Sequence, residues 1–320
     1  MQNPIQLETE SRPVVGVSAC LLGQEVRFNG GHSRNRYVTD VLGEFCSWVP
    51  VCPEVGMGMS TPRETLRLEG DPRNPRLMGK KSRIDYTDQF KAYAGPAIEH
   101  LKTLNLHGFI LKNKSPSCGM ARLPVYDHQS AVPTGVGLFA VALRMAFPLL
   151  PMEEDGRLFD ADLRESFLRK LYAYKRLCDF RKEEVTPAGL VAFHTAHKLL
   201  LAGHHQVMTR QLGRLVAQSG TRELGPLLDE YGQLFMKCLE NLCGRKRQAH
   251  TLRRVVGRLG LNRGDLREIH QTIDSYKSRL LPIAAPLTLL SHHLRNTPQI
   301  AGGIPFSLNP YPAAAAGPFD

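Results

Sequence analysis

Three cysteines follow three apolar runs, each at or just beyond the point where the run ends. The run VVGVSA ends at Cys20, SWVPV ends at Cys52, and Cys118 lies beyond GFILK in a polar turn. The carboxyl ends of parallel strands share one edge of an open α/β sheet, and ligands bind at that edge. If the three runs are parallel strands, three thiols that are distant in sequence converge on one point. None of them belongs to a CxxC pair, so no local zinc knuckle is predicted.

Three thiolates without an obvious fourth ligand fit a metal centre that keeps one open position, which is typical of catalytic metals. Thiolates favour zinc or iron–sulfur clusters over hard cations. A cubane cluster held by three cysteines would leave one iron free to act as a Lewis acid. The alternative is that all three cysteines are small buried hydrophobic residues. The other four are expected to be core residues or incidental thiols: Cys46, Cys178, Cys238 and Cys243.

Residues with acid–base potential flank these cysteines. Glu54 follows Cys52 by two positions, and the segment SPSC places Ser115 and Ser117 beside Cys118. Each of these residues could instead have a purely structural role. Glu54 could form a salt bridge, and Ser115, which precedes a proline, could cap a turn.

Cationic side chains also flank the third cysteine. Lys112 and Lys114 precede Cys118, and we expect their positive charge to lower the pKa of its thiol and to favour the thiolate.

Residues 1–158 alternate short apolar runs with helix-like segments, which predicts crossover units and a parallel, Rossmann-like sheet. Gly95-Pro96 is expected to kink or interrupt one helix. The expected strands are 13–20, 47–52 and 107–112, and the expected helices are 36–45, 88–105 and 136–147.

Residues 159–320 carry helical spacing almost throughout, so the fold class expected for the chain is α/β followed by an all-α domain. Thr186-Pro187 has the form of a helix start. Pro282 and Pro286 are expected to split the long segment 264–295, and a Pro/Gly/Ala-rich tail from about residue 297 is expected to be irregular.

The composition favours a protein of the cytoplasm with a polyanionic partner. The net charge is +11 and 42% of the 320 residues are hydrophobic. No apolar run reaches about 18 residues, so no membrane span is predicted, and the polar start MQNPIQLETE lacks the pattern of a signal peptide. Nucleic acid is the commonest partner of such a basic chain.

Several ordered motifs resemble a known family. The segments VSACLLG, VCPEVGMGM, the following PR at 62–63 and KNKSPSCG are together similar to the thiouracil desulfidase (TudS-type) family, over roughly residues 12–158. The helical half, with FHTAHKLLLAGH, resembles the YbgA-type domain. Fusions of the two resemble bacterial enzymes that remove sulfur from 4-thiouridine in transfer RNA.

The resemblance implies a [4Fe-4S] cluster on Cys20, Cys52 and Cys118 with its fourth iron open, and it implies Glu54 and Ser115 as catalytic groups. The expected reaction is a non-redox hydrolysis of the thiocarbonyl, which gives uracil or uridine and hydrosulfide. Glu54 would act as general base and then as acid. Ser117 competes with Ser115 for the role of the catalytic hydroxyl, and Lys112 would steady developing negative charge.

The expected partner is tRNA that contains 4-thiouridine, or a free thiolated uracil; no obligate protein partner is evident. Two other hypotheses stay open: a cluster-stabilised RNA-binding or sensor protein without turnover, and a zinc hydrolase that uses the same cysteines. Basic clusters bind phosphate without reading bases, although a solvated helix face is the alternative. The candidate RNA-binding residues are Lys80, Lys81, Arg83, Arg245, Lys246, Arg247, Arg253, Arg254 and Arg258.

Overall fold

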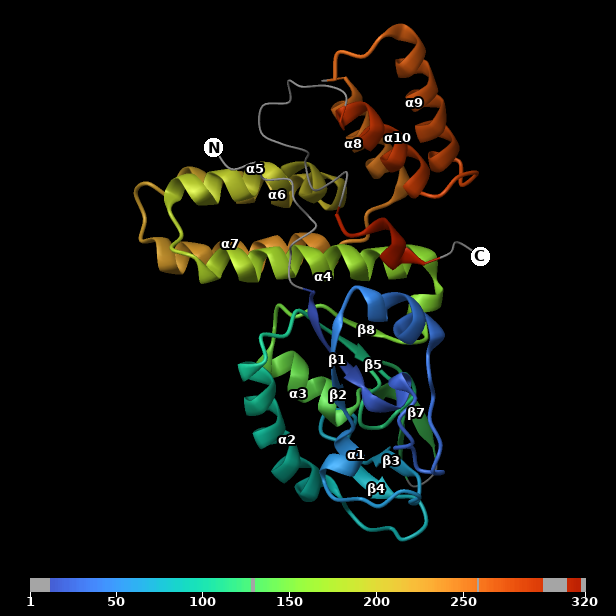
Figure 1. The fold of residues 1–320 in the computed structure, drawn as a ribbon. Helices are drawn as coiled ribbons and strands as arrows, with labels where there is room; N and C mark the ends of the chain where they lie inside the picture. Colours follow the sequence, from blue (N-terminus) through green and yellow to red (C-terminus); the bar gives the residue numbers. More distant parts are fainter. Residues whose placement is uncertain (1–11, 128–129, 258, 296–309, 318–320) are drawn as a thin grey trace. The chain divides into compact units, whose positions relative to one another are not determined.

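A computed structural model describes residues 12–127, 130–257, 259–295 and 310–317 (Figure 1). The described residues fall into two compact units, one made of residues 12–167 and the other of the described part of 168–320. Each unit is treated by itself below. Among the described residues, no helix combines the length and the apolar character needed to cross a membrane.

The first unit is built on a parallel sheet, which confirms the predicted α/β class. Val15 of the central strand pairs with Trp48 on one side and with Gly108 on the other. The inner strands are apolar because both faces of a parallel sheet are covered, and Val17, Phe109 and Ile110 are fully buried. The strand order is β2 (Ser47–Val51), β1 (Val14–Ser18), β5 (Gly108–Leu111) and β8 (Met152–Glu154).

Two helices accompany this sheet (Figure 1). Helix α3 (Leu138–Ala146) packs on β5, where the rings of Phe139 and Phe109 meet edge to face. Helix α2 (Thr87–Thr103) contacts α3 and runs unbroken through Pro96, so the interruption considered for this helix does not occur. Pro96 and Gly95 are exposed, so water can satisfy the carbonyl that the proline leaves without a partner.

The α-helix predicted over residues 36–45 is wrong in type. Residues Tyr37–Val41 form a π-helical turn (η2), and Leu42–Glu44 form a 3-10 turn (η3). The segment YVTDVLG is rich in β-branched residues and ends in glycine, and both disfavour a regular α-helix.

A second sheet in the same unit was not predicted. Its hairpins β3–β4 and β6–β7 are antiparallel, and β3 pairs with β6 in parallel. Its strands are short, so each offers few apolar positions from which a strand can be recognised. The order is β4 (Arg76–Gly79), β3 (Leu66–Glu69), β6 (Leu123–Tyr126) and β7 (Ala131–Gly135).

The second unit is helical, as predicted. Thr186 caps α5 by accepting a hydrogen bond of 3.1 Å from the Gly189 amide, next to Pro187 in the first turn. Pro282 lies between α9 and α10, but Pro286 lies within the first turn of α10, where a missing N–H costs little. Helix α4 (Ala161–Lys182) begins in the first unit. The other helices are α5 (Pro187–His204), α6 (Gln206–Ala217), α7 (Leu224–Glu240), α8 (Arg245–Val256), α9 (Arg263–Lys277) and α10 (Ala284–Arg295).

The tail predicted to be irregular from about residue 297 lies mostly outside the described residues. Its described part, 310–317, contains a 3-10 turn at Ala313–Ala316, in which Ala315 and Ala316 are buried. This part of the tail is therefore more regular than its composition suggested.

Candidate active site at the carboxyl edge of the parallel sheet

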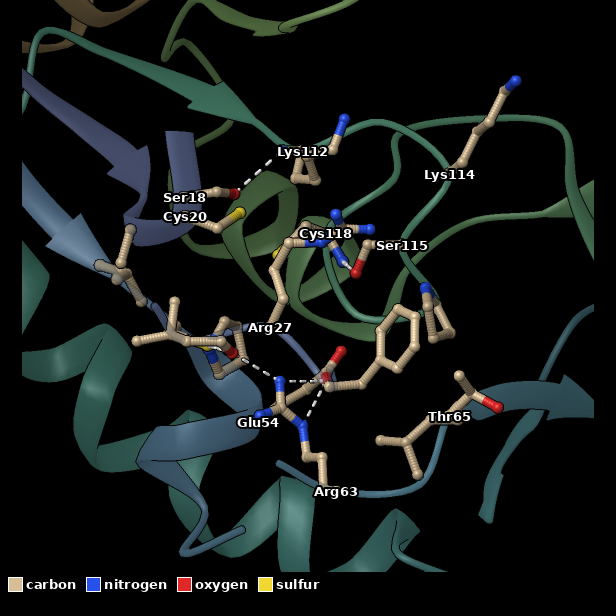
Figure 2. Close-up of a pocket in the computed structure, with 18 of the residues that line it drawn as sticks. Ser18, Cys20, Arg27, Glu54, Arg63, Thr65, Lys112, Lys114, Ser115 and Cys118 are labelled. Carbon is tan, nitrogen blue, oxygen red and sulfur yellow. Dashed lines mark hydrogen bonds and ion pairs between the residues drawn. The ribbon is translucent and has the colours of Figure 1, made fainter. Parts of the chain in front are cut away.

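A pocket of about 330 Å³ opens beyond the carboxyl ends of β1, β2 and β5 (Figure 2). Strand β1 lies between β2 and β5, so the chain leaves β1 toward one neighbour and later returns on its other side. Such a reversal of strand order creates a crevice in open α/β sheets. Cys20, Cys52 and Cys118 all line this pocket, together with Glu54 and Ser115.

The first thiol, Cys20, lies in a tight turn directly after β1. Residues Ala19–Leu22 form a 3-10 turn (η1) that ends at Gly23, whose φ of 92° suits glycine. The Cys20 carbonyl accepts a hydrogen bond of 2.9 Å from the Ser33 amide, which fixes the turn. Burial, followed by the negative charge of Cys52, raises the pKa of Cys20 to about 11.

The second thiol, Cys52, precedes the short helix α1 (Pro53–Gly56) that follows β2. Its carbonyl accepts a hydrogen bond of 2.8 Å from the Gly56 amide. Burial raises the pKa of Cys52, and the Glu54 carboxylate acts in the same direction. The amides of Val55 and Glu54 act in the opposite direction, because they can donate to the thiolate.

The third thiol, Cys118, is buried in the loop after β5. Burial dominates and raises its pKa, whereas a hydrogen bond from the Ser18 hydroxyl lowers it. We expected Lys112 and Lys114 to favour the thiolate of Cys118, and this expectation is wrong. The pKa of Cys118 is raised, and neither lysine is among the main causes of its shift; Lys112 instead lowers the pKa of Cys20.

The three thiols lie close enough to affect one another, since the charges of Cys20 and Cys52 both raise the pKa of Cys118. Among the described residues, however, no three His, Cys, Asp or Glu side chains are arranged to hold a single metal ion. A cluster of several iron atoms needs thiolates spread around a volume, because each bonds a different iron. Three thiols that line one pocket fit that need better than they fit one ion.

Glu54 is held at both carboxylate oxygens. Arg63 donates to Oε2 through Nη2 at 2.7 Å and Nε at 2.9 Å (Figure 2). Ser117 Oγ donates to Oε1 at 3.0 Å. The Arg63 side chain is only 4% exposed, and its Nη2 also donates to the Val26 carbonyl at 2.8 Å. The salt bridge that the sequence left open for Glu54 is therefore present, and it fixes the direction in which the carboxylate points.

The two candidate serines occupy different positions. Ser115 lines the pocket, and its Oγ accepts hydrogen bonds from the amides of Ser117 and Cys118 at 3.3 and 3.2 Å. These bonds occupy the lone pairs of the hydroxyl and leave its proton free to be donated. Ser117 is fully buried and donates to Glu54. Ser115 therefore both caps the turn and faces the pocket, whereas Ser117 supports the carboxylate from behind.

Lys112 also lines the pocket, and its ammonium group is paired with the carboxylate of Asp155. Its Nζ is 3.0 Å from Asp155 Oδ2, and its backbone amide donates to Ser18 Oγ at 2.9 Å. Because Asp155 compensates its charge, Lys112 acts in the pocket as a neutral pair rather than as a free cation.

Comparison with known proteins gives matches over this unit. The model of the family described as 2-thiouracil desulfurase matches residues 15–155. The uncharacterized protein YbbK of Bacillus subtilis (strain 168) is 32% identical over 135 residues, which are 41% of this chain and 89% of that protein. The chain belongs to the 2-thiouracil desulfurase family. The family resemblance read from the motifs is thereby confirmed.

The helical half of this desulfurase-family chain has its own relatives. Residues 198–312 match DUF1722, a family described as a protein of unknown function. The uncharacterized protein YbgA of Escherichia coli (strain K12) is 25% identical over 138 residues, which are 42% of this chain and 82% of that protein.

A solved structure described as [4Fe-4S]-dependent thiouracil desulfidase TudS is 27% identical. It covers 46% of this chain and 93% of its own, with a TM-score of 0.36.

The candidate RNA-binding residues of the desulfurase domain lie outside the pocket lining. Lys80 and Lys81 are exposed in the turn after β4. Arg83, with a positive φ of 61°, forms an ion pair of 2.6 Å with Glu69. These three cations therefore do not join the cysteines.

Three of the candidates on helix α8 are engaged within the helical unit. Arg245 lies over the Tyr276 ring and donates to its carbonyl, and Arg253 pairs with Asp274. Arg247 donates to two backbone carbonyls, those of His204 and Leu242.

Two candidates on α8, Lys246 and Arg254, are exposed, and the described residues give them no ion pair or side-chain hydrogen bond. The remaining candidate, Arg258, lies outside the described residues.

Sequence reasoning missed two residues that shape the pocket of this desulfurase-family chain. Ser18 contacts Cys118 and Lys112, and Arg27 lines the pocket with its side chain. The position of Ser18, two residues before Cys20 at the end of β1, was a usable signal. No sequence signal pointed to Arg27, because it lies in a loop whose residues follow no periodic pattern of hydrophobicity.

Proposed function

We propose that this chain is a [4Fe-4S]-dependent desulfidase that removes sulfur from 4-thiouridine in tRNA, or from a related thiolated uracil. The products are uridine or uracil and hydrosulfide. The observation that carries the proposal is the meeting of three thiols from three strand ends in one pocket that also holds a fixed carboxylate. Membership in the 2-thiouracil desulfurase family supports the choice of a thiolated pyrimidine.

Cys20, Cys52 and Cys118 would hold the cluster, one thiolate to each of three irons. When bound, the cluster supplies an iron without a protein ligand, a Lewis acid with affinity for the soft sulfur of a thiocarbonyl. The thiols are buried and their pKa values are raised, so cluster assembly must displace their protons.

Glu54 is the group in the pocket that can carry a proton between water and substrate. Its carboxylate accepts a proton from water as the water oxygen bonds to the ring carbon that bears sulfur, and it returns a proton when the carbon–sulfur bond breaks. Arg63 and Ser117 hold the two carboxylate oxygens and limit the motion of Glu54 during both transfers.

Ser115 and Lys112 are the remaining pocket residues with a proposed role in the reaction. The Ser115 proton faces the pocket and can be donated to a carbonyl or ring nitrogen of the pyrimidine, which orients the ring. Lys112 and Asp155 together form a polar wall, and Lys112 can respond to negative charge that develops near Cys20.

The test is turnover by the complete chain, purified without oxygen and with its cluster intact. Incubation with tRNA that contains 4-thiouridine should remove the thiolated nucleoside, measured by mass spectrometry after digestion, and should release hydrosulfide in equal amount. Free 4-thiouracil is assayed in parallel. Cys118→Ala and Glu54→Gln should abolish both signals.

Two outcomes would replace the proposal. If the chain binds tRNA and holds a cluster but releases no hydrosulfide from any thiolated substrate, it is a binding or sensor protein. If iron-free, zinc-loaded protein turns over as fast as the cluster-loaded protein, the hydrolysis is zinc-dependent.

A further inference from the structure

A second hollow of the first unit lies on one face of the second sheet, apart from the active-site pocket. It is a groove of about 660 Å³, and the residues that line it differ from those of the active-site pocket. We call it the guanidinium groove, because three arginines line it. Its charged and aromatic lining residues are Arg67, Glu69, Arg76, Arg83, Tyr126 and Asp127.

The strand register puts a row of polar residues across this face of the sheet. Arg76 of β4 is paired with Glu69 of β3, and Glu69 is paired with Tyr126 of β6. Paired residues point to the same face, and the next residue along each strand points to the other face. The adjacent row contains Leu68 and Val125, which are buried. The sheet therefore has an apolar inner face and a charged outer face, and the groove lies on the outer face.

A buried carboxylate lies at the centre of the groove. Glu69 is 7% exposed, and its two oxygens accept hydrogen bonds of 2.6 and 2.9 Å from Arg83. Oε1 also accepts a hydrogen bond from Arg67 Nε. Burial alone would raise the pKa of Glu69, but the hydrogen bonds from Arg83 and Arg67 lower it. The ionised carboxylate thus fixes two guanidiniums, and the groove still holds three guanidiniums against the two carboxylates of Glu69 and Asp127.

Arg67 is held on two sides and is open on a third. Its Nε is bound to Glu69, and its guanidinium carbon lies 4.9 Å from the centre of the Tyr126 ring. Within the part of the chain that the structure describes, its Nη1 and Nη2 make no hydrogen bond or ion pair. These two nitrogens form the edge of a guanidinium that can bind two oxygens of one phosphate. Because folding has already ordered the side chain, binding an anion here loses little further entropy.

Arg76 adds an exposed cation on the neighbouring strand. Its side chain is 61% exposed, and its ion pair with Asp85 is 3.8 Å long. An exposed pair of this length contributes little, so the guanidinium can exchange Asp85 for a phosphate. Arg67 is paired with Met78, which makes Arg76 its diagonal neighbour. Diagonal neighbours lie about 7–8 Å apart at their backbones, so the two long side chains can reach successive phosphates of one strand.

Strand β3 connects the groove to the active site. Thr65 and Leu66 line the active-site pocket, whereas Arg67 and Glu69 line the groove. Leu66 and Glu69 are separated by roughly 10 Å along an extended strand. A tRNA is much larger than this separation, so a tRNA with one base in the pocket can also reach the groove. A free base or nucleoside in the pocket cannot.

We propose that the guanidinium groove binds the phosphodiester backbone of the RNA substrate outside the active-site pocket, with Arg67 and Arg76 as the phosphate contacts. Glu69, Arg83 and Tyr126 are positioning residues, because they hold Arg67 in place. Contacts of this kind add affinity without reading the base sequence. The inference rests on the proposed function for its choice of RNA, and it adds a binding site that the hydrolysis itself does not use.

The first experiment compares two substrates of the complete, cluster-loaded chain. One is tRNA that contains 4-thiouridine, and the other is free 4-thiouridine. In the double variant of Arg67→Gln and Arg76→Gln, the ratio of kcat/KM for tRNA to kcat/KM for the free nucleoside should fall about tenfold. Damage to the active site would lower both constants together and leave the ratio unchanged. An unchanged ratio would overturn the groove as an RNA site.

The second experiment measures binding of a tRNA transcript without thiolation, so it needs no turnover. Two lost phosphate contacts should make the slope of log K against log salt shallower by about 1.4 to 1.8 in the same double variant. The matched control is Lys91→Gln with Lys102→Gln, which removes equal charge from exposed positions of α2 outside the groove. Its slope should stay near that of the parent. Equal slopes for the two double variants would overturn the proposal.

Two single variants separate the groove from net charge and from loss of the fold. Arg76→Gln changes an exposed side chain, so its Tm should match that of the parent while its salt slope becomes shallower by about 0.7 to 0.9. Arg67→Lys keeps the charge but cannot donate to Glu69 and to a phosphate at once, so its tRNA affinity should fall several-fold. Full affinity in Arg67→Lys would contradict a built site.

Failure of the proposed function would look different from failure of the groove. In the first case, no thiolated substrate loses its sulfur, while the groove variants still weaken binding of the transcript. In the second case, thiolated tRNA is turned over, and the groove variants bind and react as the lysine control does.

Discussion

The Ser117 hydroxyl donates a hydrogen bond of 3.0 Å to Glu54 Oε1, although the two residues are 63 positions apart and follow different strands. The bond joins the helix after β2 to the loop after β5 across the carboxyl edge of the sheet. Since Arg63 holds the other oxygen of Glu54, the carboxylate has little freedom to turn. This hydrogen bond distinguishes the two serines of the SPSC segment: Ser117 orients Glu54, whereas Ser115 faces the pocket.

Alanine variants of the two serines should therefore differ in kinetics. Ser117→Ala frees one oxygen of Glu54, so kcat should fall about tenfold with little change in KM. Ser115→Ala removes a substrate contact and a turn cap, so KM should rise and the chain should lose about 1 kcal/mol of stability. Both constants are measured on 4-thiouridine, with chemical denaturation for stability. The same change in kcat and KM for both variants would contradict the division of roles.

Arg63 should be needed for catalysis because it orients Glu54. Its guanidinium makes two bonds to one carboxylate oxygen and a third to the Val26 carbonyl, a geometry that lysine cannot copy. Arg63→Lys should lower kcat about a hundredfold while the chain keeps its cluster and its fold. Arg63→Ala should regain activity when guanidinium chloride is added at millimolar concentration. A variant that keeps full activity, or that guanidinium does not rescue although the chain is folded, would remove Arg63 from this role.

The ends of the three strands were predictable because each is marked locally by an apolar run, with a cysteine directly after it or in the turn or loop that follows. The contact between Ser117 and Glu54 could not be predicted from the sequence. It depends on the pairing of β1 with β2 and β5, which no local pattern specifies. The same limit applies to charge. Lys112 and Lys114 looked alike in KNKSPSC, yet Asp155, which follows β8, compensates only Lys112. The strands of the second sheet were not predicted because each is short and offers few apolar positions.

Cluster content should separate the pocket cysteines from the other buried thiols. Cys20→Ala, Cys52→Ala and Cys118→Ala should each reduce bound iron and the absorbance near about 400 nm by at least half. Cys46→Ala is the matched control, since Cys46 is buried in the same unit but does not line the pocket. It should retain its iron while losing some stability through the small cavity. Loss of iron in the control alone, or retention in all three pocket variants, would contradict the ligand assignment.

The iron-free protein should lose stability in alkali more steeply than the loaded protein. Burial raises the pKa of the pocket thiols, to about 11 for Cys20, so above about pH 9 the unfolded chain releases protons that the folded chain still holds. Their contribution is complete below that pH and is lost as pH rises through the folded pKa values. Once cluster-bound, the thiolates are deprotonated in the folded state, which removes the difference.

The Tm of both forms, measured from about pH 8 to about pH 10.5, checks this expectation. Cys46, whose pKa is raised to about 12, contributes to both forms and cancels in the comparison. Equal slopes for the two forms would mean that the pocket thiols do not become cluster ligands.

Two individual cations of the helical unit test RNA binding more specifically than the overall charge of that unit. Lys246 and Arg254 are exposed without a partner among the described residues, whereas Arg253 is paired with Asp274. If α8 contacts tRNA phosphates, Lys246→Ala with Arg254→Ala should weaken binding uniformly across sequences. The slope of log K against log salt should become shallower by about 1.8, because each phosphate contact in a duplex contributes about 0.9.

The matched control removes two arginines of the same unit that already have carboxylate partners. Arg181 pairs with Asp229, and Arg222 pairs with Glu230 at 2.9 Å, so their double alanine variant lowers the net charge equally without freeing a phosphate site. Its salt slope should stay near that of the parent. Equal slopes for the two double variants would show that the helical unit attracts RNA only through net charge, and α8 would then be a solvated face with no RNA contact of its own.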